Sequence, residues 1–212
     1  ADYLKLLGEE APHMKKHYEF ASIASSKIRK GIVDLILPLV DSLGLNEVEM
    51  VALLKDIGQT EVAAAIEGQD SIEAVLRGVE VLMEHTGLKR VHLHDLGYYL
   101  CLVKEGFVSP EATRSGLLLA ATLAAARSAA GTIEDKSEIE GGLDIPLSTR
   151  GLEKFHALAE HLKAGEEFFQ TGTTKYGPYD LAFLPTKVVP KPVLTVGLGD
   201  IISSSSFIIG TL

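Results

Sequence analysis

Hydrophobic positions along the chain recur with two different spacings. Intervals of three and four residues place side chains on one face of a helix, whereas alternation and short apolar runs are typical of strands. The predicted helices span residues 2–10, 25–44, 45–57, 61–66, 71–87, 109–131, 148–162 and 201–212. The predicted strands span residues 17–21, 89–94, 98–103, 180–189 and 193–196. Strands interleaved with helices favour a layered α/β domain with a mostly central sheet.

Local signals support several of these boundaries. Ser25 or Ser26 can cap the helix of residues 25–44, and Pro38 predicts a kink within it. Pro110 occupies the first turn of the helix of residues 109–131, and Gly87 is a typical helix end.

Composition and charge narrow the class of protein. A chain of 212 residues, 46% hydrophobic and 23% charged, is expected to form one globular domain over residues 1–212. The formal net charge of −9 disfavours nucleic acid and anionic lipid as partners. The longest apolar run, residues 117–126, is too short to cross a bilayer, so we expect no membrane partner.

The cysteine content and the N-terminal sequence indicate in which cellular compartment the protein is found. Cys101, the one cysteine, lies among apolar residues and is expected to pack as a small hydrophobe. We therefore expect a cytoplasmic protein. Ala1 follows no initiator Met and starts no secretory signal, so the N-terminus resembles a cut end.

The most informative motif is Gly197-Leu198-Gly199-Asp200, where a predicted strand leads into a predicted helix start. Because glycine has no Cβ, a phosphate can approach the backbone, and the N–H groups of the first helical turn would point at it. Asp200 adds a carboxylate within reach of the nucleophile that attacks the phosphate. The same pattern also fits a plain turn in which Asp200 caps the helix.

Two further acidic motifs carry candidate metal ligands, Glu19 in His17-Tyr18-Glu19 and Glu49 in Asn46-Glu47-Val48-Glu49. Magnesium is commonly held by one or two carboxylates together with substrate phosphates, and these two side chains can supply them. The spacing of Asn46 and Glu49 fits a helix capping box equally well, and both interpretations can hold together.

The histidines give no sign of a zinc site. His17 and His94 each fit a hydrogen-bonded histidine on a strand. No histidine has the spacing of a zinc-protease motif, so no zinc is predicted.

Four motifs occur in order along the chain: His17-Tyr18-Glu19, residues 44–49, residues 91–99 and residues 195–200. Together with the segment of residues 183–189 they resemble the ADP-dependent sugar kinases, the archaeal-type glucokinases and phosphofructokinases of the ribokinase-like superfamily. The resemblance covers nearly the whole chain. It implies a ribokinase-like three-layer α/β/α fold, incomplete here, that corresponds to the C-terminal nucleotide-binding part of the large domain without the lid domain.

The resemblance also implies a reaction and its residues. The terminal phosphate of ADP would pass to a hydroxyl of glucose or of fructose 6-phosphate, and AMP would be released. Asp200 would be the base, and the backbone of residues 197–200 would bind the transferred anion. Mg²⁺ or another divalent cation would be held largely through water. The metal-binding residues implied are Glu19, Glu49 and Asp200, and the nucleotide-binding residues are Asn46, His94, Asp95, Val189, Gly197 and Gly199.

Two positions and the chain length depart from the family pattern. Ile201 stands where a small residue is usual, and Asp95, where Thr is common, would place negative charge near the nucleotide. Such kinases are about twice as long as this chain, as the typical size of a domain leads us to expect. The part of these kinases that has no counterpart in this chain is N-terminal. We therefore expect a C-terminal fragment or truncated homologue that binds ADP with little turnover, because lid closure excludes water and assembles the site.

Other functions remain open at this point. The chain could be an inactive nucleotide-binding or interaction module whose sheet edge and apolar surface drive self-association, or it could work with a partner chain that supplies the other half. A ribokinase-like kinase that uses ATP is disfavoured by the motif set. The sugar itself, glucose or fructose 6-phosphate, is not determined, because the residues that contact it belong to the other half.

Overall fold

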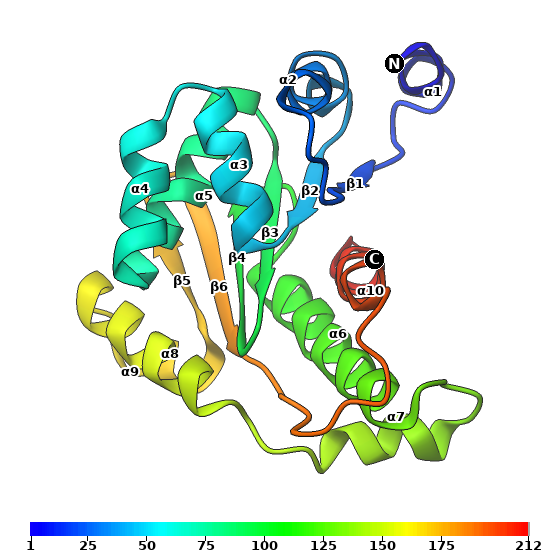
Figure 1. Ribbon diagram of the computed structural model, residues 1–212, viewed down its shortest axis with the longest axis vertical. Coiled ribbons are helices and arrows are strands. Elements are labelled where there is room, and N and C mark those ends of the chain that lie inside the picture. The colour runs from blue at the N-terminus through cyan, green and yellow to red at the C-terminus, as the bar shows by residue number, and fades with distance from the viewer. Residues whose placement is uncertain (212) are drawn as a thin grey trace. The chain divides into compact units, whose positions relative to one another are not determined.

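The computed structural model describes residues 1–211. The chain divides into two compact units, residues 1–93 and residues 94–212. Each unit combines strands with helices (Figure 1). Among the described residues, no helix is both long and apolar enough to span a bilayer.

The first unit contains a parallel three-stranded arrangement in the order β1-β2-β3. Its elements are α1 (Asp2–Glu10), β1 (His17–Glu19), α2 (Ser26–Leu35), the 3₁₀ turn η1 (Leu37–Leu39), β2 (Ser42–Leu45), α3 (Glu47–Asp56), α4 (Thr60–Gln69), α5 (Ile72–Thr86) and β3 (Arg90–Asp95), whose last two residues belong to the second unit. Glu19 is paired with Gly44, and Gly44 in turn with His92. This register brings the carboxyl ends of β1 and β2 to one edge.

Apolar side chains of α3, α4 and α5 form much of the core of the first unit. Gly78 on α5 allows this packing, because a Cβ there would lie 2.9 Å from Ile66 Cδ1 and 3.2 Å from both Leu54 Cδ1 and Met50 Cε. Interiors are close-packed, so little room exists for an added methyl group. The three helices thus pack closely against one another.

The second unit contains an antiparallel arrangement in the order β4-β6-β5. Its elements are β4 (Tyr98–Lys104), α6 (Pro110–Ala130), α7 (Lys136–Leu143), α8 (Thr149–Leu162), α9 (Glu166–Thr171), β5 (Thr173–Tyr176), β6 (Tyr179–Pro185) and α10 (Leu198–Thr211). Alternate residues of β4 face opposite sides of the sheet, as strand geometry requires. Both sides are covered, which explains why six of its seven residues are buried.

On one side, Tyr99, Cys101 and Val103 join a core cluster with α6 and α10. On the other, Tyr98 stacks on Phe183 of β6 at 5.3 Å between ring centroids. Phe155 of α8 extends this stack, 5.8 Å from the ring of Phe183. In Figure 1, α6 and α8 accordingly flank the strands of this unit from opposite sides.

Helix α10 lies alongside α6 (Figure 1). The two backbones approach closely at Gly116, where an added Cβ would collide with the carbonyl oxygen of Ser206 and lie 3.0 Å from the amide nitrogen of Gly210. Ser203 and Ser206 are completely buried. This contact fixes the position of α10, which carries Asp200 in its first turn.

Most predicted elements are confirmed, and the exceptions have local causes. The predicted helix of residues 25–44 is wrong in its second half: α2 ends at Leu35, Pro38 lies in a 3₁₀ turn, and residues 42–45 form the buried strand β2. The predicted strand of residues 193–196 is also wrong, because this segment is irregular and largely exposed. The helices α7 and α9 and the strand β5 were not predicted.

An ion pair in the first unit predicts a pH-dependent stability. Burial would raise the pKa of Asp56, but hydrogen bonds from Arg29 and Ser26 outweigh it and lower the pKa. Arg29 Nε donates to Asp56 Oδ2 at 2.5 Å, and Ser26 Oγ donates to Oδ1 at 2.6 Å. The stabilisation is therefore present above the unfolded-state pKa of about 3.9 and is lost as pH falls through the lower folded-state pKa.

Replacing Asp56 by Asn should therefore lower the free energy of unfolding at pH 7 by about 1.5 kcal/mol. Urea denaturation at pH 7, 5 and 3 should show this difference shrinking at the lowest pH, where the wild-type carboxylate begins to protonate. Asp34→Asn, at an exposed position on α2, is the matched control and should change little. A difference that stays constant from pH 7 to pH 3 would refute the role of the ionised carboxylate.

Candidate functional site

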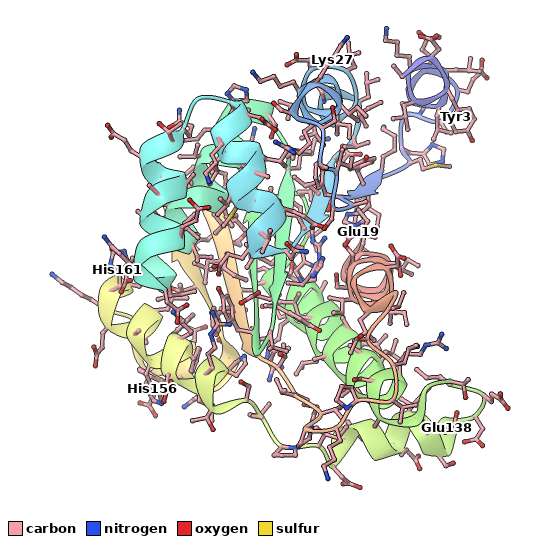
Figure 2. All side chains as sticks on the ribbon, viewed as in Figure 1. Tyr3, Glu19, Lys27, Glu138, His156 and His161 are labelled. Atoms are coloured by element: carbon pink, nitrogen blue, oxygen red, sulfur yellow. The ribbon has the colours of Figure 1, made fainter. Side chains whose placement is uncertain are left out.

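The first unit presents an acidic edge where β1 and β2 end. The carboxyl ends of parallel strands meet at one edge of a sheet, which is where ligands bind in open α/β folds. Glu19 is the last residue of β1 and pairs with Gly44, two residues before Asn46. Figure 2 shows Glu19 at this end of β1, and its side chain is 20% exposed. Glu19, Asn46 and Glu49 thus belong to the same region.

Asn46 and Glu49 form a complete capping box at the start of α3. Asn46 Oδ1 accepts from the amide of Glu49 at 2.9 Å, and Glu49 Oε2 accepts from the amide of Asn46 at 2.9 Å. The capping interpretation of this motif is therefore confirmed. Glu49 Oε1 accepts a further hydrogen bond from Ser22 Oγ at 2.9 Å. No spacing in the sequence indicates this role for Ser22, which lies 27 residues from Glu49 along the chain.

Glu49 is a buried carboxylate, only 6% exposed, and its hydrogen-bond donors at Ser22 and Asn46 are neutral groups. A buried charge is costly unless it is paired or hydrogen-bonded. Neutral donors satisfy its oxygens without neutralising its charge. A cation bound near these oxygens would therefore be favoured electrostatically.

His17 is held within the strands. Its Nδ1 lies 2.8 Å from Ser42 Oγ, and Arg90 Nη1 donates to the same hydroxyl at 3.0 Å. Its Nε2 lies 3.8 Å from Glu19 Oε2. The interpretation of His17 as a hydrogen-bonded strand histidine is confirmed, and the contact with Glu19 helps to orient that carboxylate.

In the second unit, the Gly197–Asp200 motif forms the start of α10. Gly197 has φ +76° and precedes the helix, which begins at Leu198. A side chain at Gly197 would meet nothing within 4 Å, so the space above this turn is open. The left-handed backbone favours glycine here. The first-turn N–H groups have no acceptor within the helix, and Asp200 lies exposed beside them.

The turn differs from the sequence expectation in two details. It follows an irregular segment rather than a strand, and Asp200 is the third residue of α10 rather than its N-cap. The capping interpretation of Asp200 is therefore wrong. An acidic side chain in the first turn still interacts favourably with the helix dipole.

His94 and Asp95 end β3. His94 is 8% exposed. Asp95 Oδ2 accepts from Arg150 Nη1 at 2.7 Å, so the carboxylate that departs from the family pattern is ion-paired. Arg150 lies 55 residues further along the chain and was not singled out in the sequence. Val189 is half-buried in the segment between β6 and α10.

A largely apolar cavity of about 630 Å³ lies in the second unit, between α6, α7 and the end of β6. Its lining includes Leu118, Leu143, Leu147 and Leu184, with Lys187 at the polar side. The volume and the apolar lining are typical of small-molecule sites. Lys187 is two residues before Val189, the residue that the resemblance assigns to the nucleotide.

The side chains that could bind a metal ion do not form a cluster in the described part of the chain. Within residues 1–211, no three His, Cys, Asp or Glu side chains cluster closely enough to hold a metal ion by themselves. His156 and His161 project from the outer side of α8 (Figure 2). The acidic side chains of interest are Glu19 and Glu49 in the first unit and Asp200 in the second.

Comparison with known proteins matches this chain to one group. The profile of the ADP-specific phosphofructokinase/glucokinase conserved region matches residues 2–209. An ADP-dependent glucose/glucosamine kinase of Pyrococcus abyssi is 38% identical over 98% of this chain and 44% of its own length. An ADP-specific phosphofructokinase of Methanosarcina acetivorans is 34% identical over 93% of this chain and 42% of its own length.

Solved structures agree. The last common ancestor of ADP-dependent phosphofructokinases from Methanosarcinales has a TM-score of 0.92 and 39% identity, over 98% of this chain and 44% of that one. An ADP-dependent kinase in complex with fructose-6-phosphate and ADPβS also has a TM-score of 0.92 and 39% identity, over 98% and 47%. The resemblance and the ribokinase-like α/β fold class are confirmed. The chain spans less than half the length of these relatives, and it belongs to the ADP-specific phosphofructokinase/glucokinase family.

Proposed function

We propose that this chain is the nucleotide-binding part of an ADP-dependent sugar kinase. The observation that carries the proposal is the turn of residues 197–200, with its glycine in a left-handed conformation and an aspartate in the first turn of α10. This turn occurs in a chain that a kinase family profile matches over residues 2–209. A backbone anion site with an adjacent carboxylate suits phosphoryl transfer.

In the proposed reaction, a sugar hydroxyl attacks the terminal phosphorus of ADP. Asp200 accepts the proton of that hydroxyl as the new P–O bond forms, and the bond from this phosphorus to the bridging oxygen breaks. AMP leaves with the electron pair of the broken bond. The first-turn N–H groups of α10 stabilise the charge on the transferred phosphoryl oxygens.

Mg²⁺ is the cofactor that this donor set fits. Glu19, Glu49 and Asp200 offer hard carboxylate oxygens, and the hydrogen bonds that Glu49 accepts from Ser22 and Asn46 come from neutral groups, which do not cancel its charge. Because Mg²⁺ keeps several waters and takes one or two carboxylates with substrate phosphates, it needs no cluster of three protein ligands. When bound, it would neutralise charge on the diphosphate. Asn46 uses Oδ1 in the capping box, which leaves its Nδ2 to donate to a phosphate oxygen.

His94, Asp95, Val189, Gly197 and Gly199 are the further residues that we assign to ADP. The largely apolar cavity beside Lys187, two residues before Val189, offers an apolar surface for the adenine ring of ADP. The acceptor is glucose or fructose 6-phosphate, because relatives of both specificities match this chain. We place the protein in the cytoplasm, and a single buried cysteine that forms no disulfide, Cys101, agrees with a reducing compartment.

Calorimetry with ADP tests the nucleotide site. We expect ADP to bind in the presence of Mg²⁺ and to bind about tenfold more weakly after chelation, a loss of about 1.4 kcal/mol. The matched control is AMP, which lacks the terminal phosphate and should depend less on Mg²⁺. A chain that binds no ADP with or without Mg²⁺ would refute the proposal.

An assay for AMP release with glucose and with fructose 6-phosphate tests the reaction itself. We expect little or no turnover by this chain alone and measurable turnover once it is joined to the N-terminal part of a relative. ADP binding with no sugar phosphorylation in either form would favour the alternative function, an inactive nucleotide-binding or interaction module. Self-association or a requirement for a partner chain would appear in sedimentation of the same samples.

A further inference from the structure

Arg150, near the start of α8, is anchored to the turn between β3 and β4 by three contacts. Its Nη1 donates to Asp95 Oδ2 at 2.7 Å and to the carbonyl oxygen of Leu96 at 2.8 Å. Its guanidinium carbon lies 5.6 Å from the centroid of the Tyr98 ring, within the range of a cation–π interaction. The arginine therefore contacts the carboxylate and the backbone of one turn at once.

The turn itself is tightly fixed. Gly97 has φ +105°, and a Cβ there would collide with Ser148, which caps α8. The amide of Thr186 donates to the carbonyl oxygen of Gly97 at 2.8 Å, and the amide of Ser148 donates to the carbonyl oxygen of Thr186 at 2.7 Å. Arg150 thus has a defined position relative to the segment that continues through Lys187 to Val189.

The charge of Asp95 is unfavourable for the ligand that we propose. An ionised carboxylate beside a nucleoside diphosphate repels it, and this repulsion is stronger in a partly buried site than in bulk water. The side chains of Asp95 and Arg150 are 20% and 37% exposed, so solvent screens the pair only in part. Arginine suits this role because its guanidinium is always charged and can bond a carboxylate while it lies over an aromatic ring.

We propose that Arg150 is a positioning residue for ADP, which neutralises Asp95 and holds the β3–β4 turn in the form that accepts the nucleotide. The proposal rests on the proposed function, since it requires ADP near Asp95. Arg150 acts through Asp95 and the turn rather than by chemistry on the phosphate.

A double-mutant cycle measured by calorimetry at low salt tests this role. Arg150→Gln should weaken ADP binding about tenfold, because it leaves Asp95 ionised without its cation. Asp95→Asn should tighten ADP binding a few-fold, because it leaves the arginine charge uncompensated. The double variant should return to within about threefold of wild type. Adenosine carries no phosphate, so its affinity should be nearly the same in all four proteins.

Controls separate charge from structure. Arg77→Gln removes an exposed arginine on α5 that pairs with Glu80 at 2.6 Å, and it should not change ADP affinity. Arg150→Lys keeps the charge and should retain ADP affinity within about threefold. If Arg150→Gln fails to fold, Asp95→Asn still decides the question. The proposal expects this substitution to tighten ADP binding, whereas a purely structural role of the ion pair would make it weaken ADP binding.

Three results would overturn the inference. Adenosine binding that weakens as much as ADP binding in Arg150→Gln would indicate a purely structural role. A double variant as weak as Arg150→Gln, or Asp95→Asn that weakens ADP binding, would show that the charge of Asp95 is not the cause. A wild-type chain that binds no ADP would refute this inference together with the proposed function, whereas ADP binding that is insensitive to Arg150 would refute this inference alone.

Discussion

Replacing Gly116 by Ala is expected to destabilise the second unit by about 1–3 kcal/mol, the usual cost of overpacking a close-packed interior. The new Cβ would collide with the carbonyl oxygen of Ser206 and lie 3.0 Å from the amide nitrogen of Gly210. Both contacts are with backbone atoms, so no side-chain rotation can relieve them. The helices α6 and α10 must therefore move apart, and ADP binding should weaken as the turn carrying Asp200 shifts.

Gly31→Ala provides the matched control, since Gly31 is also a helical glycine but has nothing within 4 Å of an added Cβ. It should raise the free energy of unfolding by roughly 0.5–1 kcal/mol, because alanine loses less backbone entropy in a helix. Urea denaturation followed by circular dichroism measures both variants. Equal effects of the two substitutions would mean that the α6–α10 contact does not constrain the fold.

The elements that the sequence predicts well are those with strong local signals. Helix α5 has Ser71 as its side-chain cap and Gly87 in a left-handed conformation at its end. Helix α6 has Ser109 as cap, with Pro110 at its first position. The continuous apolar run of residues 98–103 predicts strand β4, and burial on both faces of this strand explains the run.

The missed elements are decided by tertiary contacts. Residues 42–45, Ser-Leu-Gly-Leu, form β2 because all four are buried between β1 and β3, although their sequence continues the apolar spacing of α2. Helix α7 runs through Gly141 and Gly142, and Gly142 is buried where an added Cβ would meet the backbone of α6. Propensity alone cannot show that a glycine is needed for such an approach.

The candidate site was predictable only where it is local in sequence. Asn46 and Glu49 are three residues apart, so their capping box was visible as a spacing. Ser22 and Arg150 contact Glu49 and Asp95 from 27 and 55 residues away, and no spacing rule could reveal them. The assigned roles of the acidic residues stay predictions, and Asp200 offers the sharpest test of them.

Asp200→Asn is expected to lower the turnover of the proposed kinase by about 10²–10⁴-fold, the typical contribution of a general base. The variant keeps the size and shape of the side chain but cannot accept the hydroxyl proton. ADP affinity should stay within about threefold of wild type, because the proposed anion contacts are made by backbone N–H groups at the start of α10 and because Glu19 and Glu49 remain as the other proposed ligands of Mg²⁺. The effect should therefore fall on kcat.

The measurement requires a chain with turnover, so the substitution is made in a chimaera that joins this chain to the N-terminal part of the Pyrococcus abyssi kinase, which is 38% identical to it over the shared region. Asp34→Asn, an exposed aspartate on α2, is the matched control and should leave kcat unchanged. An Asp200→Asn chimaera with wild-type kcat would show that another group accepts the proton. A variant that loses ADP affinity but keeps the wild-type kcat at saturating ADP would leave Asp200 only its proposed role as a metal ligand.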